Sequence, residues 1–86
     1  MISEFTIILS EKAVDGLKAL PREVQQIIVN RLDAAKKRPF HFFIHLKSRP
    51  DYKMRCGDYR ATADIDMRER KIFVTKIGHR KDIYEK

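Results

Sequence analysis

The stretch of sequence that decides the fold is Tyr52-Lys53-Met54-Arg55-Cys56-Gly57-Asp58-Tyr59-Arg60-Ala61-Thr62-Ala63. Side chains alternate between the two faces of a strand, and Gly57-Asp58 is typical of a hairpin turn. A turn there places Arg55 directly across from Arg60, with Lys53 on the same face, while the other face is apolar. Because like charges directly opposite one another destabilise a sheet, this cationic face predicts an anion-binding site.

The residues before the hairpin predict one strand and two helices. Thr6–Leu9 is a short strand-prone run, and Ser10 follows it as the N-cap of a helix over Glu11–Ala19. A second helix, from about Pro21 to Lys37, has apolar residues at helical spacing. Pro39 is predicted to stop this helix.

The residues around and after the hairpin predict a β-meander. Residues 40–51 are interpreted as a connection or short strand that packs back onto the helices and then turns. Three antiparallel strands follow, with turns at Gly57-Asp58 and 67–70, and the third strand is predicted to end at Gly78 before a tail. The three strands are Tyr52–Cys56, Tyr59–Asp66 and Lys71–Ile77.

The order of elements predicts the fold class. A strand, two helices and a three-stranded antiparallel meander (β-α-α-β-β-β) give an α+β two-layer sandwich, with the helices on one face of the sheet. The length of 86 residues suits a single domain over 1–86.

The amino-acid composition limits which kinds of binding partner and functional site are expected. The net charge is +7, and 12 basic against 7 acidic residues lie in the second half, 44–86. Such a basic chain indicates nucleic acid, an anionic membrane surface or an acidic protein as partner, or simply a basic solvated surface. A single cysteine excludes an internal disulfide framework and a cysteine-rich zinc site. The first residues lack a secretory signal, and no apolar run approaches the roughly 18 residues of a spanning helix, so a cytoplasmic protein is expected.

Two motifs resemble the RelE/ParE superfamily of bacterial and archaeal toxins. The hairpin is similar to the family's "Tyr-basic-x-basic-x-Gly-Asp-Tyr-Arg" pattern, and the end of the chain is similar to the "Gly-His-Arg-x-x-x-Tyr" ending of RelE-like members. The second motif is Gly78-His79-Arg80-Lys81-Asp82-Ile83-Tyr84. The resemblance implies a RelE-like toxin of a type II toxin–antitoxin system.

The resemblance further implies a ribosome-dependent mRNA endonuclease without metal or cofactor. The implied partners are mRNA in the ribosomal decoding site and a cognate acidic RelB-like antitoxin in a hetero-oligomeric complex. Carried over by position, the implied catalytic residues are Lys53, Arg55, Arg60, Arg80 and Tyr84, with His79 as a further candidate.

Each of these residues has a predicted role in cleavage by the RNA's own 2′-hydroxyl. Arg60 and Arg80 would clamp the scissile phosphate, because a guanidinium fork matches phosphate oxygens. Arg55 would hold the same or the next phosphate. It stands where well-known members have lysine, and a guanidinium stays protonated.

The other three residues would move protons or hold a base. Lys53 is the candidate base, since adjacent cations disfavour its charged form. His79 is a candidate proton donor, and Tyr84 would stack on a base or orient the hydroxyl.

Other interpretations remain open. A ParE-like toxin would inhibit DNA gyrase with the same fold, and a third possibility is a basic binding module without catalysis. Considered without the resemblance, Lys53 can also be interpreted as an ordinary solvated strand residue. His41 and His45, among phenylalanines, are interpreted as packing or hydrogen-bonding residues, and Cys56 as a small core residue.

Overall fold

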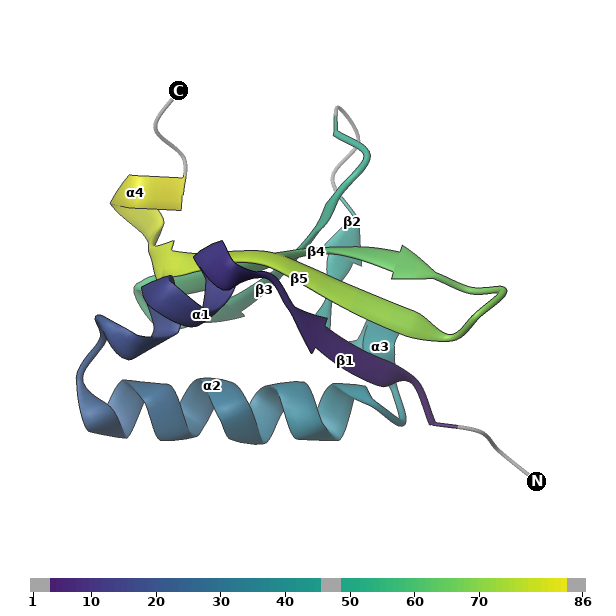
Figure 1. Ribbon diagram of the computed structural model, residues 1–86, viewed down its shortest axis with the longest axis horizontal. Coiled ribbons are helices and arrows are strands. Elements are labelled where there is room, and N and C mark those ends of the chain that lie inside the picture. Colours follow the sequence, from purple (N-terminus) through teal and green to yellow (C-terminus); the bar gives the residue numbers. More distant parts are fainter. Residues whose placement is uncertain (1–3, 46–48, 84–86) are drawn as a thin grey trace.

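A five-stranded sheet with the strand order β1-β5-β4-β3-β2 is the framework of the computed structural model, which describes residues 4–45 and 49–83 (Figure 1). β1 runs parallel to β5, and the other neighbours are antiparallel. This arrangement confirms the predicted α+β class. The strands are β1 (Thr6–Leu9), β2 (Ile44–His45), β3 (Tyr52–Cys56), β4 (Tyr59–Asp66) and β5 (Lys71–His79).

Helices lie on both sides of this sheet. In Figure 1, the long helix α2 runs beneath the sheet, while the short C-terminal helix α4 rises on the opposite side. The four helices are α1 (Glu11–Lys18), α2 (Arg22–Ala35), α3 (Pro39–Phe42) and α4 (Arg80–Ile83).

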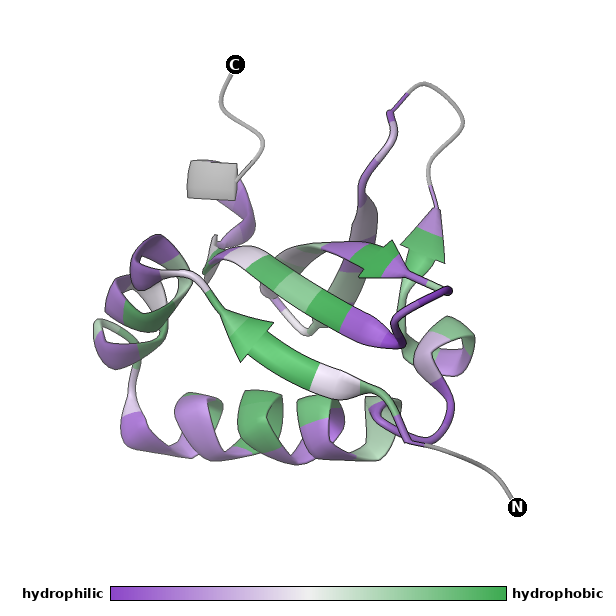
Figure 2. Ribbon diagram, turned by 45° about the vertical axis from the view of Figure 1, so that its right-hand side comes forward, coloured by the Kyte–Doolittle hydropathy of each residue, from purple (hydrophilic) through white to green (hydrophobic). Residues whose placement is uncertain are grey.

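The hydrophobic core fills the space between α2 and the sheet. Ile28 and Leu32 of α2 are buried against strand residues such as Met54 and Val74. Figure 2 shows the hydrophobic residues along β1 and the middle of β5, whereas the turn between β4 and β5 is hydrophilic. The face of the sheet that carries Met54 therefore looks inward, and the face that carries Arg55 looks away from α2.

Three predicted boundaries were wrong. The long helix ends at Ala35 rather than Lys37, and Pro39 begins a separate helix, α3, instead of only stopping α2. Proline suits the first turn of a helix because the N–H that it lacks would have no partner there. The last strand continues through Gly78 to His79, since both residues pair with β4, and the predicted tail begins as α4.

The connection from β1 into α1 is held by one side chain. Ser10 Oγ accepts a hydrogen bond from the N–H of Ala13 at 3.0 Å and donates one to the carbonyl oxygen of Thr75 at 3.0 Å. This confirms the predicted N-cap and ties α1 to β5. Gly16 lies at the closest approach of the two elements, where an added Cβ atom would overlap the carbonyl oxygen of Ile77.

Candidate functional site

The strand register brings the predicted cations together on one face. Arg55 lies directly across from Arg60, and Lys53 lies across from Thr62. Thr62 in turn lies across from Lys76 of β5. We call these five side chains the cationic face; it looks away from α2. The sequence patterns did not predict that Lys76 belongs to this face.

A β-bulge explains why Lys76 was missed. Counting back from the turn at 67–70 would pair Thr62 with Thr75, but the register shifts between Thr62 and Ala63. The shift places Lys76 opposite Thr62, and the hydroxyls of Thr62 and Thr75 lie 2.9 Å apart in a hydrogen bond. Bulges of this kind re-aim side chains and are common beside functional sites.

The members of the cationic face differ in exposure. Lys53 and Arg60 are each only 7% exposed and Thr62 only 6%, whereas Arg55 is exposed. The alternative that Lys53 is an ordinary solvated strand residue is therefore wrong. Lysine and arginine are rarely this buried in folded proteins, so the fold gives both side chains a defined environment.

A carboxylate lies at the edge of this face. Asp51 pairs with Arg49 at 3.1 Å and is half-buried. Burial alone would raise the pKa of Asp51, but the hydrogen bond from Arg49, a backbone hydrogen bond and, to a smaller extent, the charges of Arg49 and Lys53 outweigh it, so its pKa is lowered. Lys53 therefore lies close enough to stabilise a negative charge on Asp51.

The C-terminal motif meets the hairpin turn through the backbone. The N–H of Arg80 donates to the carbonyl oxygen of Asp58 at 2.8 Å. This bond brings the start of α4 to the β3–β4 turn, two residues from Arg60. The side chain of Arg80 is exposed, and Tyr84 lies outside the described residues.

His79 points away from Arg60. It lies directly across from Tyr59, with the two rings 5.4 Å apart and edge to face. Tyr59 packs against the hydrophobic core, whereas Arg60 faces the other side. The Nδ1 atom of His79 accepts the N–H of Lys81 at 3.2 Å, so His79 holds the first turn of α4.

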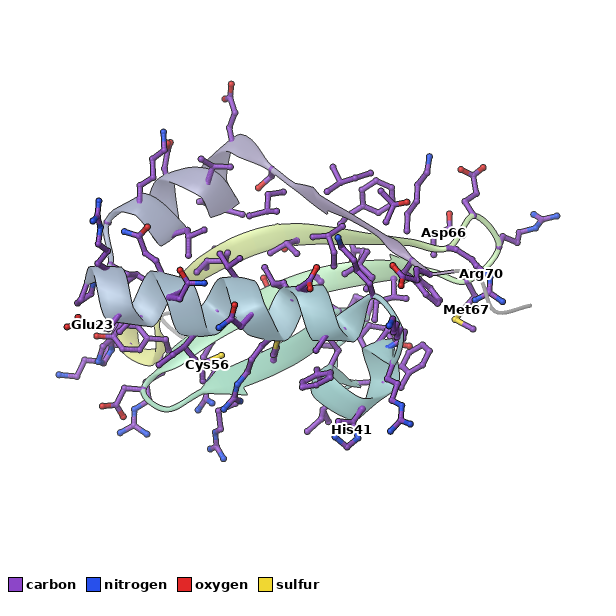
Figure 3. The ribbon with its side chains drawn as sticks, turned by 90° about the horizontal axis from the view of Figure 1, so that it is seen from below. Glu23, His41, Cys56, Asp66, Met67 and Arg70 are labelled. Carbon is purple, nitrogen blue, oxygen red and sulfur yellow. The ribbon has the colours of Figure 1, made fainter. Side chains whose placement is uncertain are left out.

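The remaining histidines and the cysteine have simpler surroundings. The ring centroid of His45 lies 4.8 Å from that of Tyr52, with the rings tilted, and the ring centroid of His41 lies 4.9 Å from that of Phe42. Both histidines make ring contacts but are exposed. Cys56 is 6% exposed and belongs to the core, as predicted; Figure 3 shows it beside α2. Burial raises the pKa of the Cys56 thiol, partly offset by the charge of Arg31.

The exposed arginines keep their charge available. Among the carboxylates of residues 4–45 and 49–81, none forms an ion pair with Arg55 or Arg80. The carboxylate of Asp66 accepts the N–H groups of Arg68 and Glu69 in the β4–β5 turn. Over the same ranges, no group of three or more His, Cys, Asp or Glu residues is placed to hold a metal ion. None of the helices in the described part of the chain is long and apolar enough to span a bilayer.

Comparison with known families gives a match over nearly the whole chain. The sequence model of the ParE toxin of type II toxin–antitoxin systems (parDE) matches residues 7–84. None of the curated proteins matches the sequence.

Solved structures of RelE toxins resemble the fold. The toxin–antitoxin complex RelBE2 from Mycobacterium tuberculosis has a TM-score of 0.77 at 18% identity, covering 88% of this chain and 98% of that chain. The archaeal RelE–RelB complex from Pyrococcus horikoshii has a TM-score of 0.78 at 21% identity, covering 90% and 96%. The intact RelBE complex of E. coli has a TM-score of 0.75 at 19% identity, covering 87% and 95%. At these identities the likeness shows a shared fold.

Proposed function

Because the chain belongs to the ParE toxin family of type II toxin–antitoxin systems, within the RelE/ParE superfamily, we propose that this toxin cleaves mRNA on the ribosome. The observation that carries the proposal is the register of β3 and β4, which sets Arg55 directly across from Arg60. Like charges in this position destabilise a strand pair. A phosphodiester bound between them would remove that repulsion.

The proposed reaction needs no metal. The 2′-hydroxyl of the RNA loses its proton and attacks the adjacent phosphorus, the bond to the 5′-oxygen breaks, and that oxygen takes up a proton. The products are a 2′,3′-cyclic phosphate and a new 5′-hydroxyl end. The protein has to stabilise the additional negative charge on the pentavalent phosphorus, which is often the largest contribution to catalysis.

The arginines suit this charge stabilisation. Arg60 is buried, so its charge acts through a medium of lower dielectric than water. Arg80 begins α4 at the β3–β4 turn, from which its exposed side chain would reach the same phosphate. Arg55, exposed and without an ion pair among the described residues, would contact the phosphate from the neighbouring strand.

Lys53 would contribute its charge to the site and stays a predicted base. Its side chain is only 7% exposed and lies on the same face as Arg55 and Arg60, so its charge would act on a phosphate bound there. Two other groups could also transfer protons. His79 is a candidate once its Nδ1 bond to the backbone of Lys81 opens, and Tyr84 remains a predicted contact to a base or to the attacking hydroxyl.

The first test compares three variants on translating ribosomes. We expect Arg60→Ala and Arg80→Ala each to lower the rate of mRNA cleavage by about 10²–10³-fold, the usual effect of removing one group that stabilises transition-state charge. Arg68→Ala, at the distant β4–β5 turn, is the matched control and should cleave at the wild-type rate. Mapping of mRNA 5′ ends gives the rate and the position of each cut.

The outcomes separate the proposed roles. If the wild type cuts within the codon in the decoding site but Arg60→Ala and Arg80→Ala cut equally fast, the phosphate clamp is wrong. Full cleavage by His79→Ala would remove His79 from the candidates for proton transfer.

A second candidate function is inhibition of DNA gyrase. The family match, which names a ParE toxin, favours it. Uncut mRNA together with inhibited DNA supercoiling would establish this alternative, and no effect in either assay would leave a basic binding module.

The proposed partner in the cell is an acidic antitoxin. The related structures from Mycobacterium tuberculosis, Pyrococcus horikoshii and E. coli are complexes of a RelE toxin with a RelB antitoxin. The net charge of +7 fits an acidic chain of that kind.

A further inference from the structure

A groove runs between α1 and the end of β5, beside the cationic face. Its volume is about 600 Å³, within the usual range for small-ligand sites. Lys12 and Asp15 of α1 and Ala19, the residue that follows this helix, line it on one side. Lys76, Gly78 and His79 line it from β5. Lys12 and Asp15 share one side of α1 because they are three residues apart.

This groove is continuous with the cationic face. Lys76 belongs to both, since it lines the groove and lies across from Thr62. Gly78 lies directly across from Arg60. Because glycine has no side chain, β5 presents only backbone between Arg60 and the groove at this position.

The charged and apolar groups that line the groove suit the binding of one nucleotide. Lys12 and Lys76 supply two positive charges against the single carboxylate of Asp15, and neither lysine forms an ion pair with another described residue. Ala19 and Leu20 add an apolar wall. Single-strand binding sites combine cations along the phosphates with a surface for the bases, usually aromatic, and here the aliphatic Ala19 and Leu20 take the place of that surface.

We propose that this groove binds the nucleotide next to the scissile phosphate, with Lys76 and Lys12 on its phosphate and Ala19 and Leu20 against its base. The inference rests on the proposed RNA-cleaving function and deepens it. The RNA would pass from the arginines over Gly78 and along α1. An acidic protein segment is the competing occupant, since it would also meet Lys12 and Lys76.

The test measures RNA binding apart from cleavage. The probe is a fluorescently labelled single-stranded RNA of about ten nucleotides, within the range that single-strand sites cover, made with 2′-O-methyl riboses so that no free 2′-hydroxyl can attack the phosphate. We expect Lys76→Ala and Lys12→Ala each to weaken binding several-fold. Each should also reduce the slope of the logarithm of the affinity against the logarithm of the salt concentration by about 1, the effect of losing one phosphate contact.

Lys71→Ala is the matched control. It removes the same charge from the same strand, but Lys71 pairs with Glu69 at 3.2 Å at the other end of β5. This variant should keep the wild-type affinity and salt dependence. Thermal unfolding of each variant checks that the fold is unchanged, and Leu20→Ala tests the apolar wall with no change of charge.

The outcomes keep the two proposals apart. If Lys76→Ala behaves like Lys71→Ala, the groove does not hold RNA, even if the wild type cleaves mRNA on ribosomes. If the wild type cuts no mRNA yet binds the probe through Lys76 and Lys12, the cleavage proposal fails and the groove remains an RNA site. If these variants lose affinity for the antitoxin alone, the groove is a protein-binding surface and the inference is overturned.

Discussion

At the scale of single residues, the buried cations are the main departure from an ordinary sheet surface. Lys53 and Arg60 are each 7% exposed, although charged side chains are costly to remove from water. Burial makes the charge of Arg60 more effective toward a bound anion, because less water screens it. The same position in an exposed strand would contribute far less.

Arg55 is the residue whose identity matters most for the mechanism. It lies across from Arg60 and is exposed. The resemblance of the hairpin to the RelE/ParE superfamily implies a lysine at this position. Lysine is a proton-transfer group when its pKa is low enough, whereas the guanidinium of arginine stays charged. In the proposed site, Arg55 therefore contributes charge and hydrogen bonds only.

We predict that Arg55→Ala lowers the cleavage rate by about 10²-fold, the effect of losing one charge-stabilising group, and that Arg55→Lys restores most of this loss. Lysine keeps the positive charge but not the two-pronged geometry of the guanidinium. Single-turnover cleavage on programmed ribosomes measures both rates. A rate for Arg55→Lys about tenfold above wild type would contradict the prediction and would show that a lysine is needed here for proton transfer.

At the scale of elements, the contact between α1 and β5 positions the end of the last strand. Ser10 bonds to β5 at Thr75, and Gly16 meets β5 at Ile77. β1 pairs with β5 only as far as Val74, and α1 packs beside the rest of the strand. This packing fixes the part of β5 that carries Lys76 and Gly78.

We predict that Gly16→Ala destabilises the fold by about 1–3 kcal/mol, the usual cost of forcing an extra methyl group into a packed contact. The added Cβ would overlap the carbonyl oxygen of Ile77, so the helix or the strand must move. Chemical denaturation of the wild type and the variant measures the difference in the free energy of unfolding.

Gly57→Ala is the matched control for Gly16→Ala. Gly57 has a φ of +61° and open space around its missing Cβ, so only backbone strain of about 1–2 kcal/mol is expected. The two variants should differ at β5: Gly16→Ala should speed amide hydrogen exchange near Ile77, and Gly57→Ala should not. Equal exchange in both would show that α1 does not hold this end of the strand.

At the scale of the whole molecule, the distribution of charge sets how the protein meets its partners. Its net charge of +7 creates a field that attracts acidic chains and nucleic acid before contact. The hydrophilic β4–β5 turn, which carries Asp66, Met67 and Arg70 in Figure 3, lies at the end of the molecule away from the start of α2. The cationic face looks away from α2, and the groove lies between α1 and the end of β5.

We predict that an acidic antitoxin binds this toxin with a rate constant that falls by about tenfold or more between low and high salt, because ions screen the attraction. The dissociation rate should change much less. Stopped-flow or surface-binding kinetics over a salt series measure both constants. An association rate that does not depend on salt would mean that apolar contacts alone guide the encounter.

The sequence by itself determined the hairpin, the order of the two main helices and of the strands that flank them, and the cations of β3 and β4. These features depend on local rules: alternation along a strand, the spacing of apolar residues along a helix, and the turn at Gly57-Asp58. The register that sets Arg55 across from Arg60 follows directly from the position of that turn.

Only the tertiary structure decided which other residues join them. The bulge after Thr62 shifts β5 by one residue and brings Lys76 onto the cationic face. Pairing with β4 carries the last strand through Gly78 to His79, and the packing of α1 forms the groove beside it. Burial of Lys53 and Arg60 likewise arises from packing between distant segments. Such contacts depend on neighbours far away in the chain, so no local pattern in the sequence records them.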